Sequence, residues 1–111
     1  MSKKRYAIVG LGSRSRMFVD ALLGEHKDRA ELTALCDVNQ TRMDLTNRIA
    51  AEEYKMKSIA TYKAEQFDDM VKKEKIDTVI VTCLDRLHHQ YIVRAMELGC
   101  DAISEKPMTV D

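Results

Sequence analysis

The sequence lacks net charge and lacks long apolar runs. Its 18 lysines and arginines are matched by 18 aspartates and glutamates, and its purely apolar stretches are only a few residues long. Proteins that bind nucleic acids usually carry a clustered basic excess, and a helix that crosses a bilayer needs about 20 apolar residues. These two absences exclude a nucleic-acid-binding protein and a membrane-spanning one.

We expect neither a secretion signal nor a disulfide framework. The apolar segment 6–9 follows basic residues, but it is too short for a signal peptide and meets Gly10 at once. The three cysteines, Cys36, Cys83 and Cys100, are an odd number without CxxC spacing, which is typical of reduced thiols. We therefore expect a cytoplasmic protein without a metal site, whose cysteines pack as small apolar residues.

With a single proline and no linker or repeat, the 111 residues read as one domain. Short apolar runs predict strands at 6–9, 32–36, 59–61, 77–82 and 102–105. Amphipathic spacing predicts helices at 13–26, 39–54, 64–73 and 87–96. This alternation predicts an α/β fold, namely a doubly wound, mostly parallel, Rossmann-like sheet that is truncated after the fifth strand.

A glycine-rich turn, Gly10-Leu11-Gly12-Ser13-Arg14-Ser15, lies between the first predicted strand and the first predicted helix. The two glycines allow a tight turn that a pyrophosphate can approach, and the start of the helix offers free N–H groups. Ser15 replaces the usual third glycine and is small enough for close packing. The residues that we expect to bind a dinucleotide here are Gly10, Gly12, Ser13, Arg14 and Ser15.

Asp37 follows the second predicted strand, 22 residues after Ser15. An acid about 20 residues after the turn is expected to bind the adenosine ribose, and its charge favours NAD over NADP. Arg14 or Arg42 would favour NADP if either reached a 2′-phosphate. Arg14 can equally stack on the adenine or face solvent, and Asp37 can equally be a turn residue or a helix cap.

Polar motifs also follow the fourth and fifth predicted strands. They are Asp85-x-x-His88 and Glu105-Lys106-Pro107, with Met96-Glu97-Leu98-Gly99 between them. Together with the turn, these motifs and their spacing resemble the cofactor domain of the glucose–fructose oxidoreductase, inositol dehydrogenase and rhizopine-catabolism family of NAD(P)-dependent oxidoreductases. The resemblance covers essentially the whole chain, although Cys83 and Leu84 stand where the family often has Thr-Pro.

The resemblance implies that Lys106 lies by the nicotinamide and assists proton transfer. The residues that it places around the cofactor are Cys83, Leu84, Asp85, His88, Glu105 and Pro107. It also implies that residues 1–111 are an incomplete dinucleotide-binding domain, without the substrate domain and inactive alone. The parent enzyme would then transfer hydride between NAD(P) and a sugar or cyclitol hydroxyl.

Other functions remain open at this point. A non-catalytic dinucleotide sensor would use the same fold, because the fold alone does not fix function. An S-adenosylmethionine methyltransferase also uses a glycine turn and an acid, but it has no role for Glu105-Lys106-Pro107. A sheet that lacks its remaining strands leaves an unpaired edge, which would favour self-association.

Overall fold

Five parallel strands form one sheet in the order β3-β2-β1-β4-β5. The computed structural model describes residues 4–11, 15–25, 28–56, 58–82 and 85–104. The strands are β1 (Lys4–Val9), β2 (Ala30–Cys36), β3 (Ala60–Tyr62), β4 (Thr78–Val81) and β5 (Asp101–Ser104). The chain moves outward from β1 to β3 and then crosses back to β4. This reversal makes the carboxyl ends of β1 and β4 the point where open α/β sheets bind ligands.

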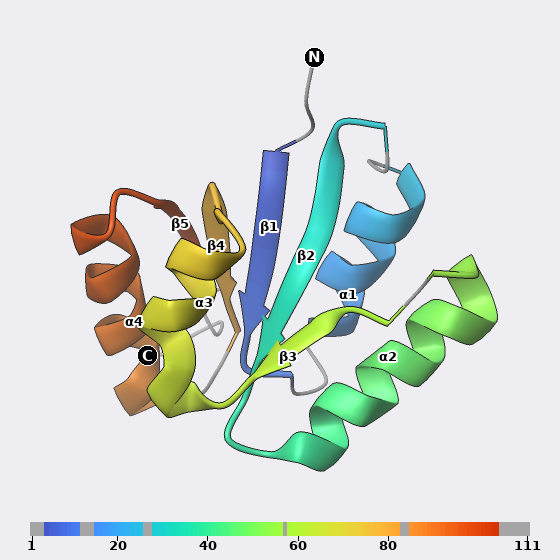
Figure 1. Ribbon diagram of the computed structural model, residues 1–111, viewed down its shortest axis with the longest axis horizontal. Helices are drawn as coiled ribbons and strands as arrows, with labels where there is room; N and C mark the ends of the chain where they lie inside the picture. Colours follow the sequence, from blue (N-terminus) through green and yellow to red (C-terminus); the bar gives the residue numbers. More distant parts are fainter. Residues whose placement is uncertain (1–3, 12–14, 26–27, 57, 83–84, 105–111) are drawn as a thin grey trace, which may run out of the picture.

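Helices cover both faces of the sheet, as Figure 1 shows. The helical elements are α1 (Ser15–Asp20), the π-helical turn η1 (Ala21–Glu25), α2 (Gln40–Tyr54), the 3-10 turn η2 (Ala64–Gln66), α3 (Phe67–Lys73) and α4 (Asp85–Glu97). We call the side with α1, η1 and α2 the α1/α2 face, and the side with α3 and α4 the α3/α4 face. The predicted doubly wound α/β fold is confirmed.

Each face of the sheet has its own hydrophobic core. On the α1/α2 face the buried residues include Ile8, Leu11, Val19, Leu32, Leu35, Met43, Ala50 and Ile80. On the α3/α4 face they include Ala7, Val9, Ala34, Cys36, Phe67, Met70, Val79, Val81 and Ala95. Val79, Ile80 and Val81 of β4 alternate between the two cores, so this run is apolar without a break, as is typical of a strand covered on both faces.

A β-bulge in β2 decides which of its side chains enters which core. Tyr6 pairs with Leu32 but Ala7 pairs with Ala34, so Thr33 is an extra residue with no partner in β1. After the bulge, Leu35 lies opposite Ile8 and Cys36 lies opposite Val9. Leu32 and Leu35 therefore join the α1/α2 core, and Ala34 and Cys36 join the α3/α4 core.

Two apolar residues of the predicted helices do not face a core. Met17 is 57% exposed and Met96 is 63% exposed. In the first helix, the α-helical turns give way to η1, and the buried residues include Val19, Leu22 and Leu23. In α4 the neighbouring Ala95 takes the buried position. The spacing correctly predicted the helices, but packing decides which of their apolar residues are buried.

The cysteines that the structure describes, Cys36 and Cys100, are both buried, as predicted. Burial raises the pKa of the Cys100 thiol, which keeps it protonated and unreactive. Cys83 lies outside the described residues. Among the helices of the described ranges, none combines the length and the apolar character that a bilayer crossing requires.

Candidate functional site: the glycine turn and the ends of three strands

The glycine turn begins directly after β1. Gly10 has a φ of 84°, a left-handed conformation that side chains with a Cβ rarely adopt. Leu11 is buried in the α1/α2 core, and Ser15, also buried, opens α1. The small side chain that replaces the third glycine therefore packs where the sequence predicts. Gly12, Ser13 and Arg14 lie outside the described residues.

The backbone of the turn is bonded to the strands on both sides of β1. The Gly10 N–H donates to the Cys36 carbonyl of β2 at 2.9 Å. On the other side, the Thr82 N–H donates to the Val9 carbonyl at 2.9 Å, and the Thr82 hydroxyl donates to the Gly10 carbonyl. The ends of β2, β1 and β4 are thus joined into one rigid edge.

Asp37 joins the same edge through its side chain. One carboxylate oxygen, Oδ2, accepts from the Leu11 N–H at 2.7 Å, and the other, Oδ1, accepts from the Asn39 N–H at 2.9 Å. The side chain is only 3% exposed. Asp37 therefore holds the turn to the loop before α2. Each carboxylate oxygen has a further lone pair with which it can accept from a ligand.

An exposed arginine lies beside this buried acid. The Nη1 atom of Arg42 is 4.0 Å from Oδ2 of Asp37, and the Arg42 side chain is 54% exposed. Asn39 caps α2, because its side chain accepts from the N–H groups of Thr41 and Arg42. The first turn of α2 thus presents a cation next to the carboxylate. A groove of about 370 Å³ between α1 and α2 adjoins this point, with Leu11, Arg42 and Leu45 among its lining.

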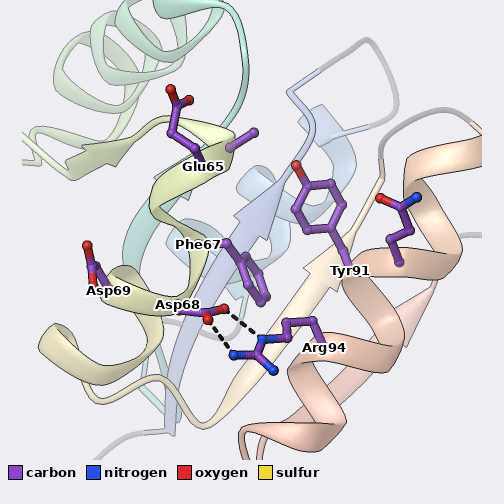
Figure 2. Close-up of a pocket in the computed structure, with 8 residues that line it drawn as sticks. Glu65, Phe67, Asp68, Asp69, Tyr91 and Arg94 are labelled. Carbon is purple, nitrogen blue, oxygen red and sulfur yellow. Dashed lines mark hydrogen bonds and ion pairs between the residues drawn. The ribbon is translucent and has the colours of Figure 1, made fainter.

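A second pocket, of about 480 Å³, lies between α3 and α4 (Figure 2). Arg94 donates from Nε to Oδ1 of Asp68 at 2.9 Å, and from Nη2 to Oδ2. This arginine holds the pKa of Asp68 below its usual range. The ring of Phe67 packs at a tilt against that of Tyr91, with centroids 5.3 Å apart. Of the predicted cofactor residues whose side chains the structure describes, none lines this pocket.

The predicted residues after β4 and β5 are described only in part. α4 begins at Asp85 and contains His88. The side chains of these two residues are outside the described part of the chain. Ser104 ends β5 and pairs with Val81, so the carboxyl ends of β4 and β5 are adjacent. Cys83, Leu84, Glu105, Lys106 and Pro107 lie outside the described residues.

Sequence reasoning missed Thr82. It is 9% exposed, and it holds the glycine turn from the β4 side. A signal was present, since Thr82 is the first residue after the apolar run of β4, at the sheet edge where the turn also lies.

Residues 4–111 match the family described as "Oxidoreductase family, NAD-binding Rossmann fold", that of Gfo/Idh/MocA. The chain belongs to this family. The oxidoreductase YteT of Bacillus subtilis, described as putative, is 31% identical over 106 residues, which are 95% of this chain and 24% of the relative. This Gfo/Idh/MocA chain thus spans about a quarter of the length of the curated relatives that it matches.

Solved structures of related dehydrogenases share the fold. The WlbA dehydrogenase of Chromobacterium violaceum, in complex with NADH and UDP-GlcNAcA, is 30% identical, with a TM-score of 0.74 over 96% of this chain and 28% of that one. The scyllo-inositol dehydrogenase of Lactobacillus casei, with bound NAD(H) and scyllo-inositol, is 28% identical. Its TM-score is 0.75 over 99% of this chain and 30% of that one. The chain is therefore an NAD-binding Rossmann domain of the oxidoreductase family.

Proposed function

We propose that the chain is the cofactor-binding part of an enzyme that transfers hydride between NAD and a hydroxyl group of a sugar or cyclitol. The observation that carries this is the edge where the glycine turn, Asp37 and the ends of β4 and β5 come together. The motif Glu105-Lys106-Pro107 follows β5 directly in the sequence. One related structure contains NADH and UDP-GlcNAcA, and another contains NAD(H) and scyllo-inositol, which supports the substrate class.

The described residues fit a dinucleotide. Gly10 has no side chain at the point where a pyrophosphate would approach, and helix α1 opens just beyond the turn. The lone pairs of Asp37 that its two backbone bonds leave free can accept from the ribose hydroxyls. In this proposal Gly12, Ser13, Arg14 and Ser15 complete the pyrophosphate site.

We assign the proton transfer to Lys106. When bound, the nicotinamide supplies the hydride acceptor. Oxidation of an alcohol also releases the hydroxyl proton, and a lysine accepts it well when burial or a neighbouring cation lowers its pKa toward neutrality. In this proposal Asp85, His88, Glu105 and Pro107 shape the surrounding pocket together with Cys83 and Leu84.

Binding of NADH tests the cofactor site. We expect saturable enhancement of nicotinamide fluorescence on titration, and no binding at millimolar NADH would contradict the proposal. Asp37→Asn removes the charge and should weaken NADH binding about tenfold, the effect of one charge-assisted hydrogen bond. Asp28→Asn is the matched control, because Asp28 is exposed just before β2, at the opposite edge of the sheet.

The same variant tests the choice between cofactors. The charge of Asp37 disfavours a 2′-phosphate, whereas the neighbouring Arg42 offsets part of that charge. We expect NADH to bind more tightly than NADPH, and Asp37→Asn to narrow the difference. Equal affinities in the unmodified chain would contradict the preference for NAD.

Lys106→Ala in the full-length protein separates an enzyme from a dinucleotide sensor. For an enzyme, turnover is lost while NADH affinity stays within about twofold, because Lys106 takes the proton and does not hold the dinucleotide. A sensor has no turnover to lose. Turnover that survives the substitution would remove Lys106 from the mechanism.

A further inference from the structure

We propose that Thr82 is a positioning residue for the glycine turn, and that it acts by holding one end of a single peptide group. This inference rests on the proposed dinucleotide site. The peptide group joins Gly10 to Leu11. Its carbonyl accepts from the Thr82 hydroxyl, and its N–H donates to Oδ2 of Asp37 at 2.7 Å. One peptide plane is thus bonded at both ends, from β4 on one side and from the end of β2 on the other.

The bond to Thr82 comes from a rigid donor. The Thr82 N–H continues the pairing of β4 with β1 by one residue, through its bond to the Val9 carbonyl. The hydroxyl also lies 3.3 Å from that same carbonyl. The strand pairing therefore holds the Thr82 backbone beside the turn, with its hydroxyl next to the Val9 and Gly10 carbonyls.

Burial strengthens the arrangement. Thr82, Leu11 and Asp37 are each less than a tenth exposed, so water cannot readily replace either bond. Hydrogen bonds that share a peptide group also polarise one another, so the bond at the carbonyl strengthens the bond at the N–H. Loss of the Thr82 hydroxyl should consequently loosen the contact between Leu11 and Asp37.

The turn needs such a restraint because Gly10 itself supplies none. Glycine rotates between backbone conformations that other residues avoid. Rotation of the Gly10–Leu11 peptide plane would turn the Leu11 N–H away from Asp37 and change the direction in which the chain enters α1. Bonds at both ends of the plane keep one orientation, so the turn is ordered before the dinucleotide arrives.

Thr82→Val and Thr82→Ser test the role of the hydroxyl. We expect Thr82→Val to weaken NADH binding about tenfold, the effect of one lost hydrogen bond, and Thr82→Ser to bind within about twofold of the unmodified chain. Thr78→Val is the matched control, because the buried Thr78 lies in the same strand at the end away from the turn. It should bind NADH normally. Normal binding by Thr82→Val, or equal losses in the Val and Ser variants, would overturn the proposal.

Amide hydrogen exchange in the absence of cofactor gives a second measurement. We expect the Leu11 amide to exchange faster in Thr82→Val and to keep its rate in Thr82→Ser and Thr78→Val. An unchanged Leu11 rate in Thr82→Val overturns the proposal whether or not the chain binds NADH. Failure of the unmodified chain to bind NADH contradicts the proposed function instead. If Thr82→Val does not fold, Thr82→Ala takes its place in both measurements.

Discussion

The two faces of the sheet use the same device to join their helices. On the α1/α2 face, Arg16 of α1 bonds Asp20 of its own helix at 2.9 Å and Glu53 of α2 at 2.6 Å. On the α3/α4 face, Arg94 of α4 bonds Glu97 of its own helix at 3.2 Å and Asp68 of α3. In each case one exposed arginine bridges two helices over a buried apolar core.

The two faces differ in their connection to the glycine turn. Leu11, from the turn itself, belongs to the core of the α1/α2 face. Helix α2 also begins beside Asp37, whose Oδ1 accepts from the N–H of its cap residue Asn39. The core of the α3/α4 face contains neither Leu11 nor another residue of the turn among those described. Packing should therefore affect cofactor binding on one face and only stability on the other.

The largest expected effect on this difference comes from the replacement of two matched core methionines. Met43 in α2 and Met70 in α3 are both fully buried, one on each face. Replacement of either by alanine should lower the free energy of unfolding by about 2–5 kcal/mol, measured by chemical denaturation. Where both variants are folded, we expect Met43→Ala to weaken NADH binding severalfold and Met70→Ala to leave it nearly unchanged. Equal affinities would show that the faces do not differ in this way.

Helix capping provides a test of intermediate size. The Asn39 side chain accepts from two N–H groups at the start of α2, so Asn39→Ala should cost about 1 kcal/mol of unfolding free energy. Near the start of α3, the Gln66 side chain accepts only from the Lys63 N–H, at an exposed position. We therefore expect Gln66→Ala to cost less. Thermal unfolding of both variants measures this, and a larger loss in Gln66→Ala would contradict the assignment of the caps.

The smallest expected effect concerns acid. Hydrogen bonds from Arg16 and then Tyr54 lower the pKa of Asp20, and a hydrogen bond from Arg94 lowers that of Asp68. An aspartate whose pKa is lower in the folded state than its unfolded value of about 3.9 stabilises the fold at pH values above about 3.9. This stabilisation is lost as the pH falls through the folded-state pKa. The temperature at the midpoint of unfolding should therefore decrease as the pH is lowered below about 4.

Asp20→Asn and Asp68→Asn should each reduce this acid sensitivity, because neither variant has a carboxylate to protonate there. We expect a reduction in each variant, since Asp20 accepts from Arg16 and Tyr54, and Asp68 accepts from Arg94 through both of its oxygens. Unfolding midpoints at pH 7 and pH 2.5 measure the difference. If the midpoint decreases by the same amount in both variants as in the unmodified chain, these pairs are not the source of the acid sensitivity.

The sequence was sufficient to predict the order of strands and helices. Apolar runs and helical spacing depend on local periodicity, and the chain keeps that periodicity throughout. The cap of α2 at Asn39 and the buried face of α3, with Phe67, Met70 and Val71, were also predictable, because both depend on neighbours a few residues apart.

Long-range contacts were less predictable. The bonds of Asp37 to Leu11 and of Thr82 to Gly10 join residues 26 and 72 positions apart. Spacing alone indicated an acid near the ribose, but it did not show that the acid also supports the turn. The exposure of Met17 depends likewise on how α1 packs against the sheet, since Ser15 and Val19 of that helix are the buried residues.

The bulge at Thr33 has a consequence for the direction of Asp37. In a strand, side chains alternate between faces, so one extra residue reverses the side on which every later residue points. Deletion of Thr33 would keep every polar residue of the turn. The side chain of Asp37, which follows β2, would however point toward the opposite face of the sheet, away from Leu11. The bond between Asp37 and the glycine turn thus depends on the number of residues in β2 as well as on their identity.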